Sequence, residues 1–127
     1  MLNKGLRDEE SIRIDNALKR LLTVVFVPKS LSEAENSDVE KQLGYLGLNV
    51  QDIIDLDSDE FIERLQNKKL DWNNFEQFAD FLMNYSNKDD ENRFVVSEKA
   101  IAIYNFIQKE SRTFSFGIVG KIAAANK

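Results

Sequence analysis

The chain has 127 residues, of which 43% are hydrophobic and 31% charged, a length and balance that predict a single globular domain over residues 1–127 with one apolar core. Five Gly and one Pro are too few for the many tight turns of a β-sandwich or barrel. The sequence contains no Cys, which excludes thiol chemistry, and no His, which removes the commonest general base and metal ligand.

The net charge of −5 is unevenly distributed along the chain. Residues 1–29 contain six basic and four acidic side chains, whereas residues 30–63 contain ten acidic side chains and one basic residue, Lys41. An acidic middle segment repels phosphate backbones, so we expect no nucleic-acid partner. Such a segment either keeps the protein soluble or attracts a basic partner.

The first predicted helix runs from Asp8 to Val27. Its acidic first turn suits the helix dipole, and Pro28 ends it. Apolar residues recur along it at three- and four-residue spacing, forming one stripe that consists of Ile14, Ala17, Leu18, Leu21, Leu22 and Val25. The apolar run 21–27 is far too short to span a bilayer, and no signal peptide precedes it. We therefore expect no membrane association and a cytoplasmic location.

Capping signals divide the acidic middle into shorter helices. Residues 30–46 contain two capping boxes, which begin at Ser30 and Ser37. Either the first box caps a short turn, or one helix runs through both, and Gly47 is a predicted C-terminal stop. Asn49 is predicted to cap a helical turn that ends near Leu56, and Ser58 to cap a helix over 59–66.

Two longer helices follow, and the loop between them is short. Asp71 is predicted to cap a helix over 72–85, and a second helix covers 91–111. The buried face of the latter consists of Val96, Ala100, Ile103, Tyr104 and Ile107. Ser115 is expected to cap a last helix, and residues 1–7 and 123–127 are expected to be flexible ends. The sequence thus predicts an all-α fold of about six amphipathic helices in antiparallel hairpins, with 72–85 and 91–111 at the centre.

No residue pattern predicts catalysis or metal binding. The run 55–59 resembles the start of a calcium-binding EF-hand loop, but Glu60 stands where the loop needs Gly and Gln66 where it needs Glu. Asp38, Glu40, Asp80 and Glu98 are most simply interpreted as solvent-facing. We expect no catalytic residue, no cofactor and no metal.

Two groups of side chains are candidates for an interaction surface. Arg13, Lys19 and Arg20 lie opposite the apolar stripe of the first helix, where they form either a solvated face or a site for an acidic partner, including a second copy's acidic segment. Helix 72–85 is apolar around much of its circumference because it carries Trp72, Phe78 and Phe81. That helix is therefore either central and contacted on several sides, or part of a groove or dimer interface.

The segment 98–107 resembles the second helix of a tetratricopeptide unit, with Ala100 as the small residue and Tyr104 as the bulky residue four positions later. With the Leu46-Gly47-Leu48 turn, residues 12–122 are similar to small tetratricopeptide-like bacterial domains of unknown function. The chain lacks the closing Pro and the thirty-four-residue period of true repeats. The resemblance implies an interaction fold and carries over no active site.

The sequence therefore predicts a protein–protein interaction module, whose partner is another protein or a second copy of the chain. The alternative is a small-molecule-binding or regulatory domain with a pocket lined by Phe75, Phe78 and Tyr104. A filled core beside an exposed apolar patch would favour the interaction module.

Overall fold

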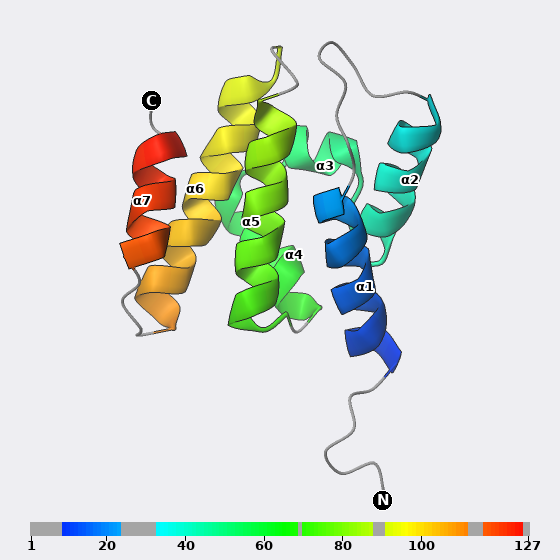
Figure 1. The fold of residues 1–127 in the computed structure, drawn as a ribbon, viewed down its shortest axis with the longest axis horizontal. Coiled ribbons are helices and arrows are strands. Elements are labelled where there is room, and N and C mark those ends of the chain that lie inside the picture. The colour runs from blue at the N-terminus through cyan, green and yellow to red at the C-terminus, as the bar shows by residue number, and fades with distance from the viewer. Residues whose placement is uncertain (1–8, 24–32, 69, 88–90, 112–115, 126–127) are drawn as a thin grey trace, which may run out of the picture.

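The computed structural model describes residues 9–23, 33–68, 70–87, 91–111 and 116–125, and this part of the chain is all-helical, without a strand. Seven helices are described, where the sequence predicts about six: α1 (Glu9–Thr23), α2 (Glu33–Gly44), α3 (Val50–Asp55), α4 (Ser58–Asn67), α5 (Trp72–Ser86), α6 (Arg93–Glu110) and α7 (Phe116–Ala125) (Figure 1). The predicted all-α class is confirmed.

Helices α5 and α6 form the antiparallel hairpin at the centre of the molecule, as the short loop between them predicts (Figure 1). Helix α1 packs on α5, and α2 packs on α1. On the opposite side α7 packs on α6, while α3 and α4 contact α6 from behind (Figure 1). The helices thus form a front layer with the spatial order α2, α1, α5, α6 and α7. The two short helices α3 and α4 lie behind this layer.

The core forms where the apolar stripes of these helices meet. All five residues of the predicted α6 face are buried. Phe78 of α5 stacks on Phe61 of α4, with ring centroids 5.8 Å apart, and on Phe81 at 6.1 Å. Of the two interpretations of helix 72–85, the structure shows the central one, because neighbours cover α5 on several sides.

Side-chain caps set the beginnings of three helices. Asn49 accepts a hydrogen bond from the backbone N–H of Asp52 (2.8 Å), whose carboxylate accepts one from the N–H of Asn49 (3.1 Å), and the predicted cap of α3 is confirmed. Asp71 caps α5 in the same reciprocal way with Asn74, also as predicted. The cap of α4, by contrast, is Asp57, which accepts from the N–H of Glu60 at 2.8 Å.

The predicted cap of α4 at Ser58 is therefore wrong, and the capping sequence at Ser37 does not begin a helix. Ser58 is already the first residue of α4, one position after its cap. Ser37 lies inside α2, which begins at Glu33, so the first of the two capping sequences is nearer to the true start. Both sequences satisfy the local pattern, so the pattern alone does not decide where the helix begins.

Gly47 ends the second helical region as predicted. Its φ is +74°, a conformation that side chains disfavour, and the N–H groups of Gly47 and Leu48 donate to the carbonyls of Gly44 (3.1 Å) and Leu43 (3.1 Å). This pair of hydrogen bonds is the Schellman motif, which satisfies the last carbonyls of a helix and turns the chain.

Several predictions fall near the limits of the described residues. The predicted helix end at Val27, Pro28, the Ser30 box, the Ser115 cap and the flexible end 1–7 all lie outside them. Of the predicted flexible end 123–127, Ala123–Ala125 are helical and belong to α7, and residues 126–127 lie outside the described part. Within the ranges that the structure describes, none of the helices has the length and apolar character needed to cross a bilayer.

Candidate interaction groove

A polar cluster fastens α7 to the central hairpin. The hydroxyl of Tyr104 on α6 donates a 2.6 Å hydrogen bond to Asp80 on α5. The Nζ of Lys121 on α7 donates to Glu76 (2.6 Å) and lies 3.0 Å from Asp80. Side chains of three helices therefore meet at the carboxylates of Glu76 and Asp80. The sequence analysis predicted a solvent-facing Asp80, but the structure shows it half-buried in this cluster.

The cluster holds its charges in one protonation state. Burial, and then the hydrogen bond to Asp80, raises the pKa of Tyr104 far above its usual value, so the phenol stays neutral and donates. Burial by itself would lower the pKa of Lys121, but its contacts with Glu76 and Asp80 raise it. The charge of Lys121, the one ionisable residue of α7, is thus satisfied within its own chain.

An open groove lies where the end of α5, the beginning of α6 and the end of α7 meet; we call it the α5–α6–α7 groove. Its cavity volume is about 510 Å³. Its lining is Met83, Ser86, Asn87, Arg93, Phe94, Val95, Ser97, Glu98, Ile101, Ala124 and Ala125. Apolar side chains of all three helices face this space, and Arg93 and Glu98 contribute one charge of each sign.

Phe94 stands at the edge of the groove with 87% of its surface exposed. It precedes Val96, the first buried residue of α6, by two positions. Side chains that are two positions apart in a helix point in nearly opposite directions, so Phe94 points away from the core. A Phe side chain loses about 1.5–3 kcal/mol of burial free energy when it is left in water, so this position is costly unless something covers it.

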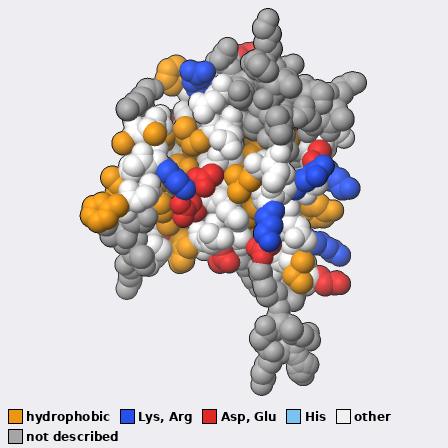
Figure 2. Space-filling model, viewed as in Figure 1, with side chains coloured by type: hydrophobic (Ala, Val, Ile, Leu, Met, Phe, Trp, Pro, Cys, Tyr) orange, Lys and Arg blue, Asp and Glu red, His pale blue; other side chains and the backbone are white. Residues whose placement is uncertain are grey.

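The outer side of α7 continues this apolar surface. Phe116 is 82% exposed and Val119 is 41% exposed, while Gly120 and Ala123 are also exposed. These four residues follow the spacing i, i+3, i+4, i+7 and form one face of the helix. Figure 2 shows hydrophobic side chains gathered at the left of the molecule, over α7, and most of the visible Lys and Arg side chains to the right, over α1 and α2.

The basic residues predicted as a surface are exposed on α1, but they are partly neutralised within the chain. Arg13, Lys19 and Arg20 all face solvent. The Nε of Arg20 donates a 2.7 Å hydrogen bond to Asp38 on α2, which holds the pKa of that carboxyl below its usual value. The acidic segment is thus in part the ion-pair partner of the same molecule's first helix.

The predicted aromatic surface is corrected by the structure. Phe78 and Phe81 are fully buried, because α5 is covered on several sides, and they form no surface in this molecule. Trp72 remains 42% exposed at the beginning of α5, where its ring lies 5.7 Å from that of Phe106. Trp72 is therefore separated from the groove by most of the length of α5.

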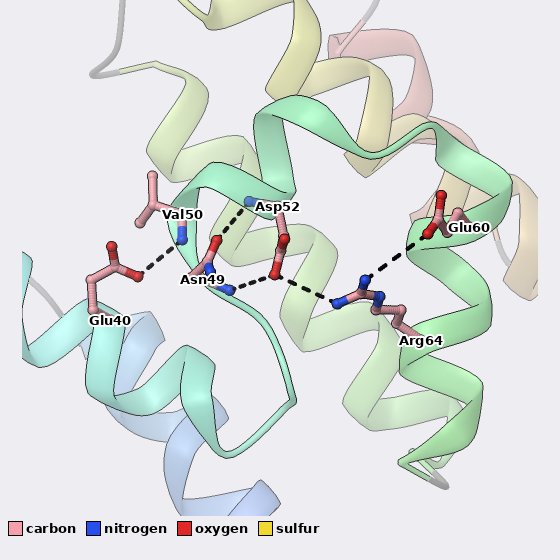
Figure 3. Close-up of polar contacts among 6 residues, drawn as sticks. All are labelled: Glu40, Asn49, Val50, Asp52, Glu60 and Arg64. Atoms are coloured by element: carbon pink, nitrogen blue, oxygen red, sulfur yellow. Dashed lines mark hydrogen bonds and ion pairs between the residues drawn. The ribbon is translucent and has the colours of Figure 1, made fainter.

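Three acidic side chains of the middle segment, Glu40, Asp52 and Glu60, pair with groups at and near the beginnings of α3 and α4. Figure 3 shows Glu40 accepting from the N–H of Val50 (3.0 Å), the reciprocal cap of Asn49 and Asp52, and Arg64 reaching from Asp52 (3.8 Å) to Glu60 (4.0 Å). A smaller cavity of about 270 Å³ lies beside Arg64, Gly47 and Lys68. Among the residues with described positions, no three acidic side chains come together as a metal site would require.

Sequence reasoning missed Phe94 and Phe116, although two signals point to them. Phe94 lies off the α6 stripe that the sequence analysis identified. In 116–125 the apolar residues encircle the helix and Lys121 is the single charge, so one side had to remain exposed or find a partner.

The part of the chain that the structure describes is all-helical and has an exposed apolar surface at its α6–α7 side. Comparisons with models of protein families, with curated proteins and with solved structures find no match to this chain.

Proposed function

We propose that the protein is a protein–protein interaction module that receives an apolar, aromatic side chain of its partner in the α5–α6–α7 groove. The observation that carries this proposal is the nearly complete exposure of Phe94 at the edge of an apolar groove of about 510 Å³. Exposed aromatic residues beside a preformed hollow are typical of the anchor sites at which interfaces concentrate their binding energy.

The alternative small-molecule pocket receives less support. Phe75, Phe78 and Tyr104, which were expected to line it, are all buried in the core. Neither of the two cavities described above is lined by any of the three. A filled core with an exposed apolar patch is the arrangement that favours an interaction module.

The tetratricopeptide-like packing is also a proposal. Ala100 and Tyr104 are both buried, and Ala100 lies on the α6 face that the sequence analysis identified. A small side chain there lets neighbouring helices approach closely. If this packing is correct, Ala100→Leu should overpack the core and lower the free energy of unfolding by about 1–3 kcal/mol.

The groove can be tested with a probe that imitates one aromatic side chain. N-acetylphenylalanine amide titrated into isotope-labelled protein should shift the amide NMR signals of Met83, Ile101 and Ala125, with a dissociation constant of about 1–10 mM for so small a ligand.

Two neighbouring alanines provide a matched pair of variants. Ala124→Glu places a charge in the groove and should abolish the shifts, whereas Ala123→Glu places the same charge on the same helix outside the lining residues and should retain them. Both positions are exposed, so both variants should fold. Shifts that spread evenly over the surface, or that survive Ala124→Glu, would contradict the proposed site.

A further inference from the structure

The outer face of α7 restricts what can cover it. Its exposed residues Phe116, Gly117, Val119, Gly120, Ala123 and Ala124 carry no charge. The single charge of the helix, on Lys121, is turned toward Glu76 and Asp80. A charged side chain brought against this face would lose its hydration without gaining an ion pair, so the covering surface must itself be uncharged. The same face of a second molecule meets this condition.

We propose that the partner is a second copy of this chain, docked by antiparallel pairing of the two α7 helices about a twofold axis at Gly120, with Phe116 of each copy in the α5–α6–α7 groove of the other. This inference rests on the proposed function of the groove and adds the identity of its occupant. A twofold interface must be self-complementary, with each patch opposite its counterpart.

The helix meets this requirement because the bulky Phe116 and the small Ala124, which lines the groove, lie symmetrically about Gly120. Phe116 precedes Gly120 by four residues, and Ala124, which lines the groove, follows it by four. At 1.5 Å and 100° per residue, these two positions lie about 6 Å along the axis and about 40° around it, on opposite sides of Gly120. A twofold axis through Gly120 therefore brings Phe116 of one copy to the height of Ala124 of the other, and Ala123 to the height of Gly117, so that each pair lies in one layer of the antiparallel helices.

Close approach of the two helices is possible at the axis itself. A Cβ added to Gly120 would meet no atom within 4 Å, so the position opens directly to the surface. Gly117, Ala123 and Ala124 lie near the axis on the exposed face, and their small side chains let two helix backbones come together beside the bulky Phe116.

The exposed area agrees with a modest dimer. Phe94 and Phe116 are 87% and 82% exposed, and an aromatic side chain buries about 150–250 Å². Two such residues per copy supply about a third to a half of the roughly 800 Å² per partner of a standard interface, and the rest of the α7 face and the groove supply more. We therefore expect a reversible dimer with a dissociation constant of about 1–100 μM.

The decisive variant is Gly120→Arg, and Gly44→Arg is its matched control. Both glycines are exposed helix residues with open space around an added Cβ, so each variant should fold and each changes the net charge equally. In sedimentation equilibrium, the wild type and Gly44→Arg should approach twice the protomer mass of 14.7 kDa as concentration rises. Gly120→Arg brings two like charges to the axis and should weaken the dimer at least about 100-fold.

The arrangement of the two helices can be tested by disulfide trapping, because the chain contains no cysteine. Gly120→Cys should form a disulfide-linked dimer on mild oxidation, since symmetry brings the two Cα atoms near to the roughly 4.4–6.8 Å that a disulfide needs. Phe116→Cys should not link to itself, because its copies lie about 12 Å apart along the axes, but it should link to Ala124→Cys when the two variants are mixed.

The outcomes separate this inference from the function on which it rests. A monomer at all concentrations would overturn the dimer, as would equal dimerisation of Gly120→Arg and Gly44→Arg or efficient linking through Gly44→Cys. If the aromatic probe still binds the groove in that case, the interaction site stands and only its occupant is wrong. If the protein dimerises as proposed, the probe should bind Gly120→Arg more tightly than wild type, because Phe116 of the second copy no longer fills the groove.

Discussion

At the level of single residues, Tyr104 shows how the core and the polar cluster support each other. Its ring is buried, and its hydroxyl donates to Asp80, which also lies 3.0 Å from Lys121. Hydrogen bonds to a charged acceptor contribute more than neutral ones because the acceptor attracts the donor more strongly.

Replacing Tyr104 by Phe should therefore lower the free energy of unfolding by about 1.5–3 kcal/mol, measured by urea denaturation. Tyr45→Phe is the control, because Tyr45 is 39% exposed; its effect should stay within about 0.5 kcal/mol. Equal effects of the two substitutions would show that the Asp80 contact contributes nothing to stability.

Lys99 is the opposite case, a buried charge that the fold tolerates at a cost. It is 3% exposed on α6, and burial lowers its pKa, while Glu98 and Asp57 partly offset that effect. Since the folded protein binds this proton less tightly than the unfolded chain, the contribution of Lys99 to stability improves as pH rises toward its usual pKa of 10.5.

Lys99→Met should thus raise the free energy of unfolding at pH 7 by about 1 kcal/mol, and the gain should shrink in alkaline solution. Lys109→Met, at an exposed position on the same helix, should change stability by less than about 0.5 kcal/mol. Thermal denaturation at two pH values measures both effects. A lower melting temperature for Lys99→Met would mean that its amine has a stabilising partner.

At the level of the helices, the true cap of α4 is one residue earlier than the predicted one. Asp57 accepts the hydrogen bond from Glu60, and Ser58 is already helical. Asp57→Ala should lower the free energy of unfolding by about 1 kcal/mol, whereas Ser58→Ala should cost less than about 0.5 kcal/mol. Chemical denaturation of the two variants decides between the two caps, and a larger loss for Ser58→Ala would restore the sequence-based assignment.

The same comparison shows what local sequence can predict. The caps at Asn49 and Asp71 and the turn at Gly47 were predictable because their hydrogen bonds join residues at most five positions apart. The start of α2 was not, because two equivalent capping sequences, which begin at Ser30 and Ser37, lie close together and the local pattern does not distinguish them. Apolar spacing gave the buried face of α6, yet it could not show that Asp80 pairs with Tyr104 and Lys121, which lie 24 and 41 positions away.

At the level of the whole molecule, burial separates aromatic residues that the sequence cannot distinguish. Phe78 and Phe81 were candidates for a surface, and the structure places them in the core, whereas Phe94 and Phe116 were not considered and are the most exposed aromatic residues described. The difference arises from how many helices surround each one, which is a property of the assembled fold.

Two parallel substitutions test this assignment. Phe78→Leu should lower the free energy of unfolding by about 1–3 kcal/mol, because it leaves space in a filled core. Phe94→Leu should change stability by less than about 0.5 kcal/mol under conditions in which the protein is monomeric. Urea denaturation of dilute protein measures both variants, and comparable losses would indicate that Phe94 is covered within the protomer.

The position of Trp72 has a practical consequence. It is the single tryptophan of the chain, and its indole ring lies 5.8 Å from Phe75 and 5.7 Å from Phe106, at the end of the α5–α6 hairpin that is remote from the groove. Its fluorescence emission is therefore a natural reporter of whether the hairpin is closed. Occupation of the groove should leave the emission maximum unchanged, while separation of the hairpin should shift it to longer wavelength, so one optical signal distinguishes a variant that has lost binding from one that has lost its fold.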